Sequence, residues 1–203
     1  MPSPQRLMKL FFSTLFLLVT AHKVVGQTTI NAEIPRISER PTIDGIVETL
    51  EWESAVRIPV NIEVEPRDNV AADVSADALI MEDGEIIYVA FIAKDPDPEQ
   101  IRGFYQDRDN GWEGDFMGII LDTFNDERRA FGFYVNPLGV QMDSVYDDIN
   151  QREDESWNAI WDSVGRITEK GYTVELAIPL KQLRFPENDS IQTWGMDLYR
   201  HYP

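Results

Sequence analysis

Cysteine is absent from the chain, and histidine occurs only twice, at His22 and His201. The absence of cysteine excludes a disulfide framework and thiol chemistry. Two histidines at opposite ends of the chain do not support a histidine-based triad or a zinc hydrolase. No Gly-x-Ser-x-Gly elbow and no glycine-rich phosphate loop occurs either. These absences disfavour catalysis within this chain.

Basic residues are also scarce, since 18 lysines and arginines face 36 aspartates and glutamates, a net charge of −18 at pH 7. A strongly anionic surface repels phosphate backbones, so we expect no nucleic-acid partner. The charge is compatible with neutral ligands, with divalent cations or with solubility alone. Five tryptophans, seven tyrosines and ten phenylalanines among 43% apolar residues indicate a globular chain.

A long hydrophobic run is missing as well. The apolar segment 10–19 is too short to cross a bilayer, which needs roughly 20 residues. It follows Arg6 and Lys9 and precedes the small residues Ala21 and Gly26, which is the pattern of a secretory signal peptide. We therefore expect cleavage after Gly26, which is favoured over cleavage after Ala21, and no transmembrane helix in the mature chain. The expected location is the periplasm, the outer membrane or the extracellular space.

The sequence predicts one domain after this signal peptide of residues 1–26. Residues 27–40 form a lead-in, and residues 41–203 are long enough to bury roughly 70% of the unfolded surface. Alternation at 60–65 and 74–80 marks half-buried strands, and 86–93 reads as a central strand. Further strands are expected at 101–106, 116–121, 130–136, 140–146, 160–168, 172–178 and 193–199, and short helices at 49–55 and 179–185. Roughly ten strands separated by turn signals predict an all-β, antiparallel β-sandwich.

One stretch is crowded with carboxylates: Asp143, Asp147, Asp148, Glu153, Asp154 and Glu155. Oxygen-rich loops bind calcium, yet no calcium-loop signature occurs, so a solvated charged loop is favoured over an ion site. No cofactor is predicted with certainty, and calcium stays an alternative. Glycoside hydrolysis needs only two carboxylates about 5 to 9.5 Å apart, so a carboxylate-based glycosidase also stays open.

Aromatic residues give the stronger indication of function. Trp112 lies between two glycines where no core pattern requires it, and Trp157 and Trp161 share one face as either strand or helix. An exposed indole suits the apolar face of a sugar ring, with nearby polar groups such as Arg108 bonding the hydroxyls. A core position is favoured for Trp161, surface exposure is favoured for Trp112, and Trp157 stays open. The candidate carbohydrate-binding residues are Trp112, Trp157, Trp161, Tyr105 and Arg108.

Several segments also follow one another in a fairly specific order. They are Pro41-Thr42-Ile43-Asp44-Gly45-Ile46, Glu51-Trp52-Glu53-Ser54-Ala55, Ile87-Tyr88-Val89-Ala90-Phe91 with Asp95, and Val174-Glu175-Leu176-Ala177-Ile178-Pro179 through Leu183. Together they resemble a family 9 carbohydrate-binding module over roughly residues 40–200. Further segments resemble one subgroup, found at the N-terminus of longer exported bacterial proteins with a C-terminal β-rich domain of unknown function. These are Arg108-Asp109, residues 121–126 and 136–141, Leu183-Arg184-Phe185-Pro186 and Trp194-Gly195.

The resemblance implies a β-sandwich of about ten strands that binds polysaccharide or oligosaccharide, with calcium in some members. It also implies an association with enzymes that hydrolyse O-glycosyl compounds in carbohydrate catabolism, two tryptophans that clamp a sugar, and a further domain beyond Pro203. The first hypothesis is an exported, non-catalytic carbohydrate-binding module. The alternatives are a glycoside hydrolase with paired carboxylates and a structural domain that packs on a C-terminal β-barrel.

Overall fold

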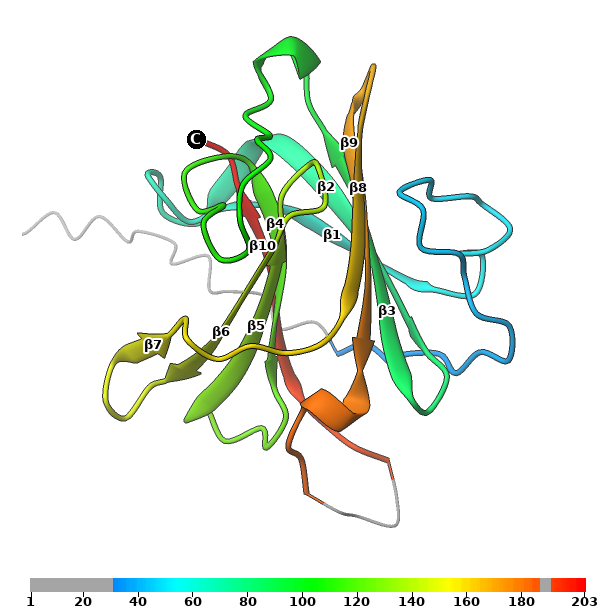
Figure 1. The fold of residues 1–203 in the computed structure, drawn as a ribbon, viewed down its shortest axis with the longest axis vertical. Helices are drawn as coiled ribbons and strands as arrows, with labels where there is room; N and C mark the ends of the chain where they lie inside the picture. The colour runs from blue at the N-terminus through cyan, green and yellow to red at the C-terminus, as the bar shows by residue number, and fades with distance from the viewer. Residues whose placement is uncertain (1–30, 187–190) are drawn as a thin grey trace, which may run out of the picture.

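The protein is a sandwich of two five-stranded antiparallel sheets, seen in a computed structural model that describes residues 31–186 and 191–203 (Figure 1). Sheet A orders its strands as β1 (Val56–Glu63), β2 (Val70–Glu82), β3 (Ile86–Lys94), β9 (Gly171–Pro179) and β8 (Asp162–Thr168). Sheet B orders them as β10 (Gly195–His201), β4 (Phe116–Asp122), β5 (Arg129–Val135), β6 (Gln141–Asp147) and β7 (Arg152–Asp154). The predicted antiparallel β-sandwich is confirmed. The predicted signal peptide lies outside the described residues.

Several predicted elements differ from the structure. Residues 101–106 form no strand and begin a long loop. Side chains, and not a neighbouring strand, bond its backbone: the Asp115 carboxylate accepts from the N–H of Arg102, and the Asn136 amide donates to the carbonyl of Phe104. The expected helix at 49–55 is a series of turns, with hydrogen bonds from the N–H of Trp52 to the carbonyl of Glu48 and from the N–H of Ala55 to the carbonyl of Trp52. The Trp52 side chain packs on sheet A. The helix expected at 179–185 shrinks to one 3-10 turn, Leu180–Gln182, and a second 3-10 turn spans Pro98–Gln100. No described helix is long and apolar enough to span a membrane.

The main core lies between the two sheets and follows from the alternation of the strands. On β4 the inward residues Met117, Ile119 and Leu121 are almost fully buried, and on β5 Phe133 and Val135 are fully buried. Period-two alternation turns the intervening residues of each strand to the outer face. Each sheet therefore has a second face that the chain must cover or expose.

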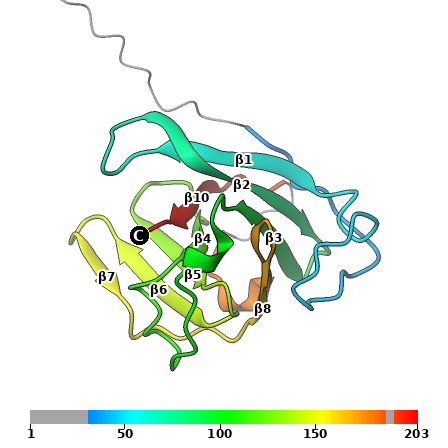
Figure 2. The same cartoon turned by 90° about the horizontal axis from the view of Figure 1, so that it is seen from above.

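The outer face of sheet A is covered by residues 31–55, which run beside β3 (Figures 1 and 2). Trp52 is 3% exposed and packs with Leu79, Met81 and Tyr88. Glu175 fastens this segment, because its carboxylate accepts hydrogen bonds from three donors. These are the backbone N–H groups of Asp44 (2.9 Å) and Gly45 (2.7 Å) and the Trp52 indole (3.0 Å).

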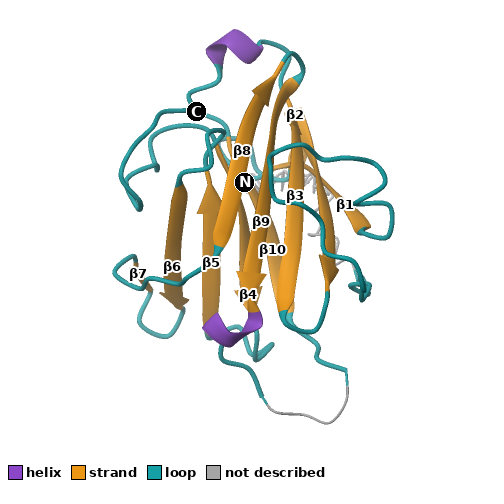
Figure 3. Cartoon of the chain, turned by 45° about the vertical axis from the view of Figure 1, so that its right-hand side comes forward, coloured by secondary structure: helices purple, strands orange, loops and turns teal. Residues whose placement is uncertain are grey.

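Sheet B ends in the short β6–β7 hairpin, which stands away from sheet A in every view (Figure 3). A connecting segment, residues 155–161, returns from β7 to β8 and joins the two sheets. The outer face of sheet B is crossed by the loop of residues 101–115. These two segments, and not the strands themselves, hold the predicted site residues.

Candidate functional site

Aromatic side chains gather on the outer face of sheet B. Phe116, Tyr134, Tyr199 and His201 come from neighbouring strands, and Trp112 joins them from the 101–115 loop. The Phe116 ring lies 4.8 Å from His201 and 5.8 Å from Tyr199, both stacked. Trp112 meets Phe116 and Tyr134 edge-on, with centroids 5.6 and 5.1 Å apart. We call these five residues the outer aromatic face.

Two glycines make room for the floor of this face. The Tyr134 ring lies over Gly118 and Gly132, since a Cβ atom on either glycine would meet the ring at 2.3 or 2.6 Å. Any larger residue there would push the ring off the sheet. Burial raises the pKa of Tyr134 to about 12, and the neighbouring Glu153 carboxylate acts in the same direction. The ring is therefore a neutral, fixed part of the floor.

Trp112, Tyr199 and His201 are the more accessible members of the outer aromatic face. Tyr199 is 39% exposed and Trp112 is partly buried, whereas Phe116 and Tyr134 are only 5% and 7% exposed. Gly111 lets the loop approach closely, because a Cβ atom there would lie 2.6 Å from the Met142 sulfur. Exposed Asp197 lies beside Ile120 on the same face. The arrangement offers ring surface together with polar groups, which is what recognition of a sugar requires.

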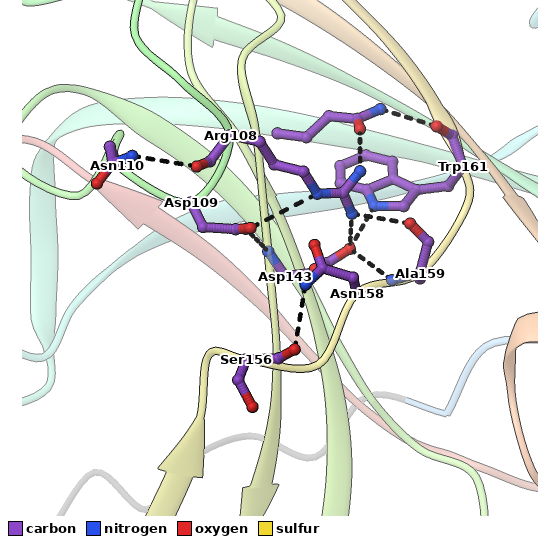
Figure 4. A network of polar contacts seen from close by, with 9 residues as sticks. Arg108, Asp109, Asn110, Asp143, Ser156, Asn158, Ala159 and Trp161 are labelled. Atoms are coloured by element: carbon purple, nitrogen blue, oxygen red, sulfur yellow. Dashed lines mark hydrogen bonds and ion pairs between the residues drawn. The ribbon is translucent and has the colours of Figure 1, made fainter.

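Arg108 does not contribute free donors to this face, contrary to the role we expected from the sequence. Its guanidinium pairs with Asp143, donates to the Gln141 side-chain oxygen (2.8 Å) and donates to the carbonyl of Ala159 (2.8 Å), as Figure 4 shows. These contacts tie the 101–115 loop to β6 and to the segment that follows β7. Arg108 is therefore a positioning residue.

Asp143 is the centre of the same network. Its side chain is fully buried and accepts hydrogen bonds from the Trp161 indole (2.8 Å) and the backbone N–H of Ala159 (3.2 Å), besides the Arg108 pair (Figure 4). Burial raises the pKa of this carboxyl, and the bond from Trp161 and the charge of Arg108 oppose the rise. One carboxylate thus fixes the segments that carry Trp112 and Trp157.

The other predicted aromatics lie elsewhere. Trp161 is 4% exposed and packs against Phe133 in the core, so its ring offers no face to a ligand. Trp157 is partly buried on the inner side of sheet B, 5.2 Å from the Phe131 ring. Tyr105 is 84% exposed on the loop. Trp112 and Trp157 lie on opposite faces of sheet B, so the structure does not bring them together.

The acidic stretch is distributed over both faces of sheet B and the turns beyond it. Asp143 is bonded within the core network, Glu153 accepts from the Ser144 hydroxyl at 2.5 Å on the outer face, and Asp154 accepts from Ser156. Within residues 31–186 and 191–203, no group of three or more histidine, cysteine or acidic side chains could hold a metal ion. Calcium binding therefore has no support from the described residues.

Sequence reasoning missed Phe116, Tyr134, Tyr199 and His201. The sequence pattern predicts strands over Phe116, Tyr134 and Tyr199 and does not indicate that their rings share one surface with His201. One sequence pattern indicates the position of the Tyr134 ring. Gly132 lies two residues before Tyr134 on the same strand, and Gly118 lies on the strand expected before it. An aromatic flanked by glycines across a sheet indicates a ring that lies flat on the strands.

Comparison with known families shows the family of the chain. Residues 43–200 match the family described as "Carbohydrate family 9 binding domain-like". No curated protein matches the chain.

Two solved structures share the fold. One is a candidate carbohydrate-binding protein from Bacteroides uniformis, with a TM-score of 0.60, 14% sequence identity, and 82% of this chain and 81% of that chain covered. The other is a family 9 carbohydrate-binding module from Caldicellulosiruptor kristjanssonii in complex with cellotriose. It has a TM-score of 0.51, 18% identity, and 81% of this chain and 73% of that chain covered. At such identities these likenesses show the fold alone.

Proposed function

The chain belongs to the carbohydrate family 9 binding domain-like family, and we propose that it is an exported, non-catalytic module that binds glycan at the outer aromatic face. The observation that carries this proposal is the position of Trp112 and Tyr199, which both contact Phe116 and are two of the three more accessible rings of that face. The exposed carboxylates of Asp197 and Glu153 would accept hydrogen bonds from sugar hydroxyls.

Export and targeting complete the proposal. The charged, apolar and small-residue pattern of residues 1–26 supports secretion to the periplasm, the outer membrane or the extracellular space. A binding module serves carbohydrate catabolism by holding a larger protein on its polysaccharide, so we propose this targeting role. The net charge of −18 supports a neutral polysaccharide over a polyanionic one.

The test is calorimetric titration of the purified protein with cellotriose and other neutral oligosaccharides, after a glycan array has identified the best ligand. Trp112→Ala and Tyr199→Ala should each weaken binding about tenfold or more, the loss expected for one aromatic stacking surface. Phe124→Ala removes an aromatic that is 49% exposed in the β4–β5 turn, so it serves as a matched control and should bind like the wild type. Unchanged affinity in both face variants would refute this site, and release of free sugar would indicate a hydrolase.

A further inference from the structure

A hollow lies at the β6–β7 end of sheet B, on the face opposite the outer aromatic face. Its volume is about 200 Å³. The lining residues are Arg129, Val145, Asp147, Asn150, Arg152 and Asp154. We call it the β6–β7 hollow.

Strand register places alternating charges along this hollow. Arg129 lies opposite Asp147 and Asp147 opposite Arg152, which gives one cross-strand row of plus, minus and plus. The next row toward the core pairs Val145 with Asp154. Because the β6–β7 hairpin stands away from sheet A (Figures 1 and 2), the charged row is not covered by the opposing sheet.

Val145 is the apolar residue in the lining of the hollow. Val145 pairs across the strands with Phe131, and the Phe131 ring lies 5.2 Å from the ring of Trp157. Trp157 also contacts Phe133, so it lies over β5 and is only partly buried. The hollow therefore has its apolar side at Val145, next to the core residue Phe131, and its charged groups along Asp147 and Arg152.

The polar groups of the hollow are held in place and ionised. The Asp147 carboxylate accepts hydrogen bonds from the backbone (3.2 Å) and side chain (2.9 Å) of Asn150, and these bonds hold the pKa of Asp147 below its ordinary value. The Ser156 hydroxyl, 2.6 Å away, does the same for Asp154. Both carboxylates thus stay hydrogen-bond acceptors at neutral pH.

The guanidinium groups of Arg129 and Arg152 keep N–H donors that can bind a ligand. Arg129 reaches Asp147 only at 4.0 Å. In the described part of the chain, no carboxylate lies within 4.0 Å of the Arg152 guanidinium. A sugar hydroxyl can donate to a carboxylate and accept from a guanidinium at once, so this row matches vicinal hydroxyls.

We propose that the β6–β7 hollow is a second glycan subsite, which takes one neutral sugar ring over Val145 with its hydroxyls on Asp147 and Arg152. The inference rests on the proposed function and extends it to a separate face. The hollow is smaller than the roughly 300 to 1,000 Å³ of sites for larger ligands, so it fits a single ring. Two arginines balance two aspartates there, and the whole chain carries −18, which together favour a neutral sugar over a uronate.

The experiment titrates the full-length protein, expressed with its own N-terminal segment, with cellotriose or with the neutral oligosaccharide that the array selects. We expect two sites per chain. Asp147→Asn and Arg152→Ala should each weaken one site about tenfold, the loss expected for one charge-assisted hydrogen bond, and should leave the Trp112 site intact. Asp147 and Arg152 both lie outside the core, so neither substitution leaves a cavity there. Arg128→Ala, an exposed arginine one residue before β5, is the matched control.

The outcomes separate the two proposals. Loss of one site in Asp147→Asn with the other retained supports the second subsite, and so does a single site that only the hollow variants abolish. One site that Trp112→Ala abolishes and the hollow variants do not touch overturns this inference while the proposed function stands. A wild-type protein that binds no neutral glycan overturns both. Binding in the hollow of oligouronate alone overturns the assignment to a neutral sugar.

Discussion

Sheet A and sheet B each turn one face away from the shared core, and the chain covers these two faces very differently. Residues 31–55 seal sheet A with an apolar layer around Trp52, Met81 and Tyr88. On sheet B the 101–115 loop covers only Phe116, Tyr134 and Met142 and leaves Tyr199 accessible. Strand alternation is the same in both sheets, so the covering segments decide which face is free to bind a ligand.

Both covers are fastened by a buried carboxylate. Glu175 holds the N-terminal segment on sheet A, and Asp143 holds the 101–115 loop and the segment after β7 on sheet B. The difference is that Asp143 is paired with a cation, Arg108, whereas Glu175 accepts only from neutral donors. If the two covers have the roles proposed, removing either carboxylate should destabilise the protein, but only one removal should affect binding.

The largest effect is expected from Asp143→Ala. It leaves the Arg108 guanidinium, whose side chain is 33% exposed, with Asp109 at 3.6 Å as its remaining carboxylate, so we expect a cost of about 3 kcal/mol, the lower end of the range for breaking a buried pair. Glycan affinity should fall with it, because the segments that carry Trp112 and Trp157 lose their common anchor. Chemical denaturation measures the first effect and calorimetric titration below the unfolding transition measures the second.

Asp143→Asn is the milder partner of that variant, since it keeps the shape and one acceptor. It should lie between the wild type and Asp143→Ala in both measurements. An alanine variant that binds glycan with full affinity would contradict the role of Asp143 as the anchor of the two tryptophan-bearing segments.

Glu175→Gln should have the next largest effect, about 2–3 kcal/mol of unfolding free energy. Both carboxylate oxygens of Glu175 accept hydrogen bonds from N–H donors, and glutamine replaces one of these oxygens by an NH2 group, which faces a donor and leaves it unpaired. Glycan affinity should be unchanged at temperatures where the variant is folded. A parallel loss of affinity would show that the cover of sheet A also shapes the binding face, and the contrast between the two sheets would fail.

A smaller effect is expected from Gly118→Ala on the outer aromatic face. The added Cβ would lie 2.3 Å from a ring carbon of Tyr134, so the ring must move, and overpacking of this kind costs about 1–3 kcal/mol. Because Tyr134 supports Trp112, affinity should drop as well. Gly195→Ala in β10 is the matched control, with its nearest contact at 3.2 Å, and should change both quantities much less.

The fold was predictable from the sequence, and the site only in part. Alternation and turn residues were sufficient for the sandwich, because period two directly reports which side of a strand is buried. The same reasoning placed Trp112 near the surface but missed that its neighbours would be Phe116 and Tyr134, since strand order across a sheet is not written in local patterns. Local patterns also cannot show that Arg108 is bonded within the protein, because its partner Asp143 lies 35 residues away in the sequence.

The smallest expected effect is the dependence of stability on pH, to which buried carboxylates of both sheets contribute. Burial raises the pKa values of Asp115, Asp143 and Glu175 above their ordinary values, although bonded donors oppose the rise. For a carboxyl with a raised pKa, the folded state binds its proton more tightly than the unfolded state does. The contribution of these groups to stability therefore increases as pH falls from neutral through their raised pKa values toward about 4.

The melting temperature should accordingly rise by a few degrees between pH 7 and about pH 5, helped by the smaller net negative charge. Below about pH 4 it should fall, because Asp83 and Glu63 have lowered pKa values and lose their favourable contacts when protonated. Asp115→Asn isolates one group on the sheet B side: its Oδ1 atom is buried without a partner, so the variant should melt higher at pH 7 and show a flatter rise. Asp68→Asn on an exposed turn changes the net charge equally and should keep the wild-type slope, so calorimetry on both separates burial from net charge. Equal slopes in the two variants would mean that net charge alone drives the pH response and that burial of Asp115 contributes nothing to it.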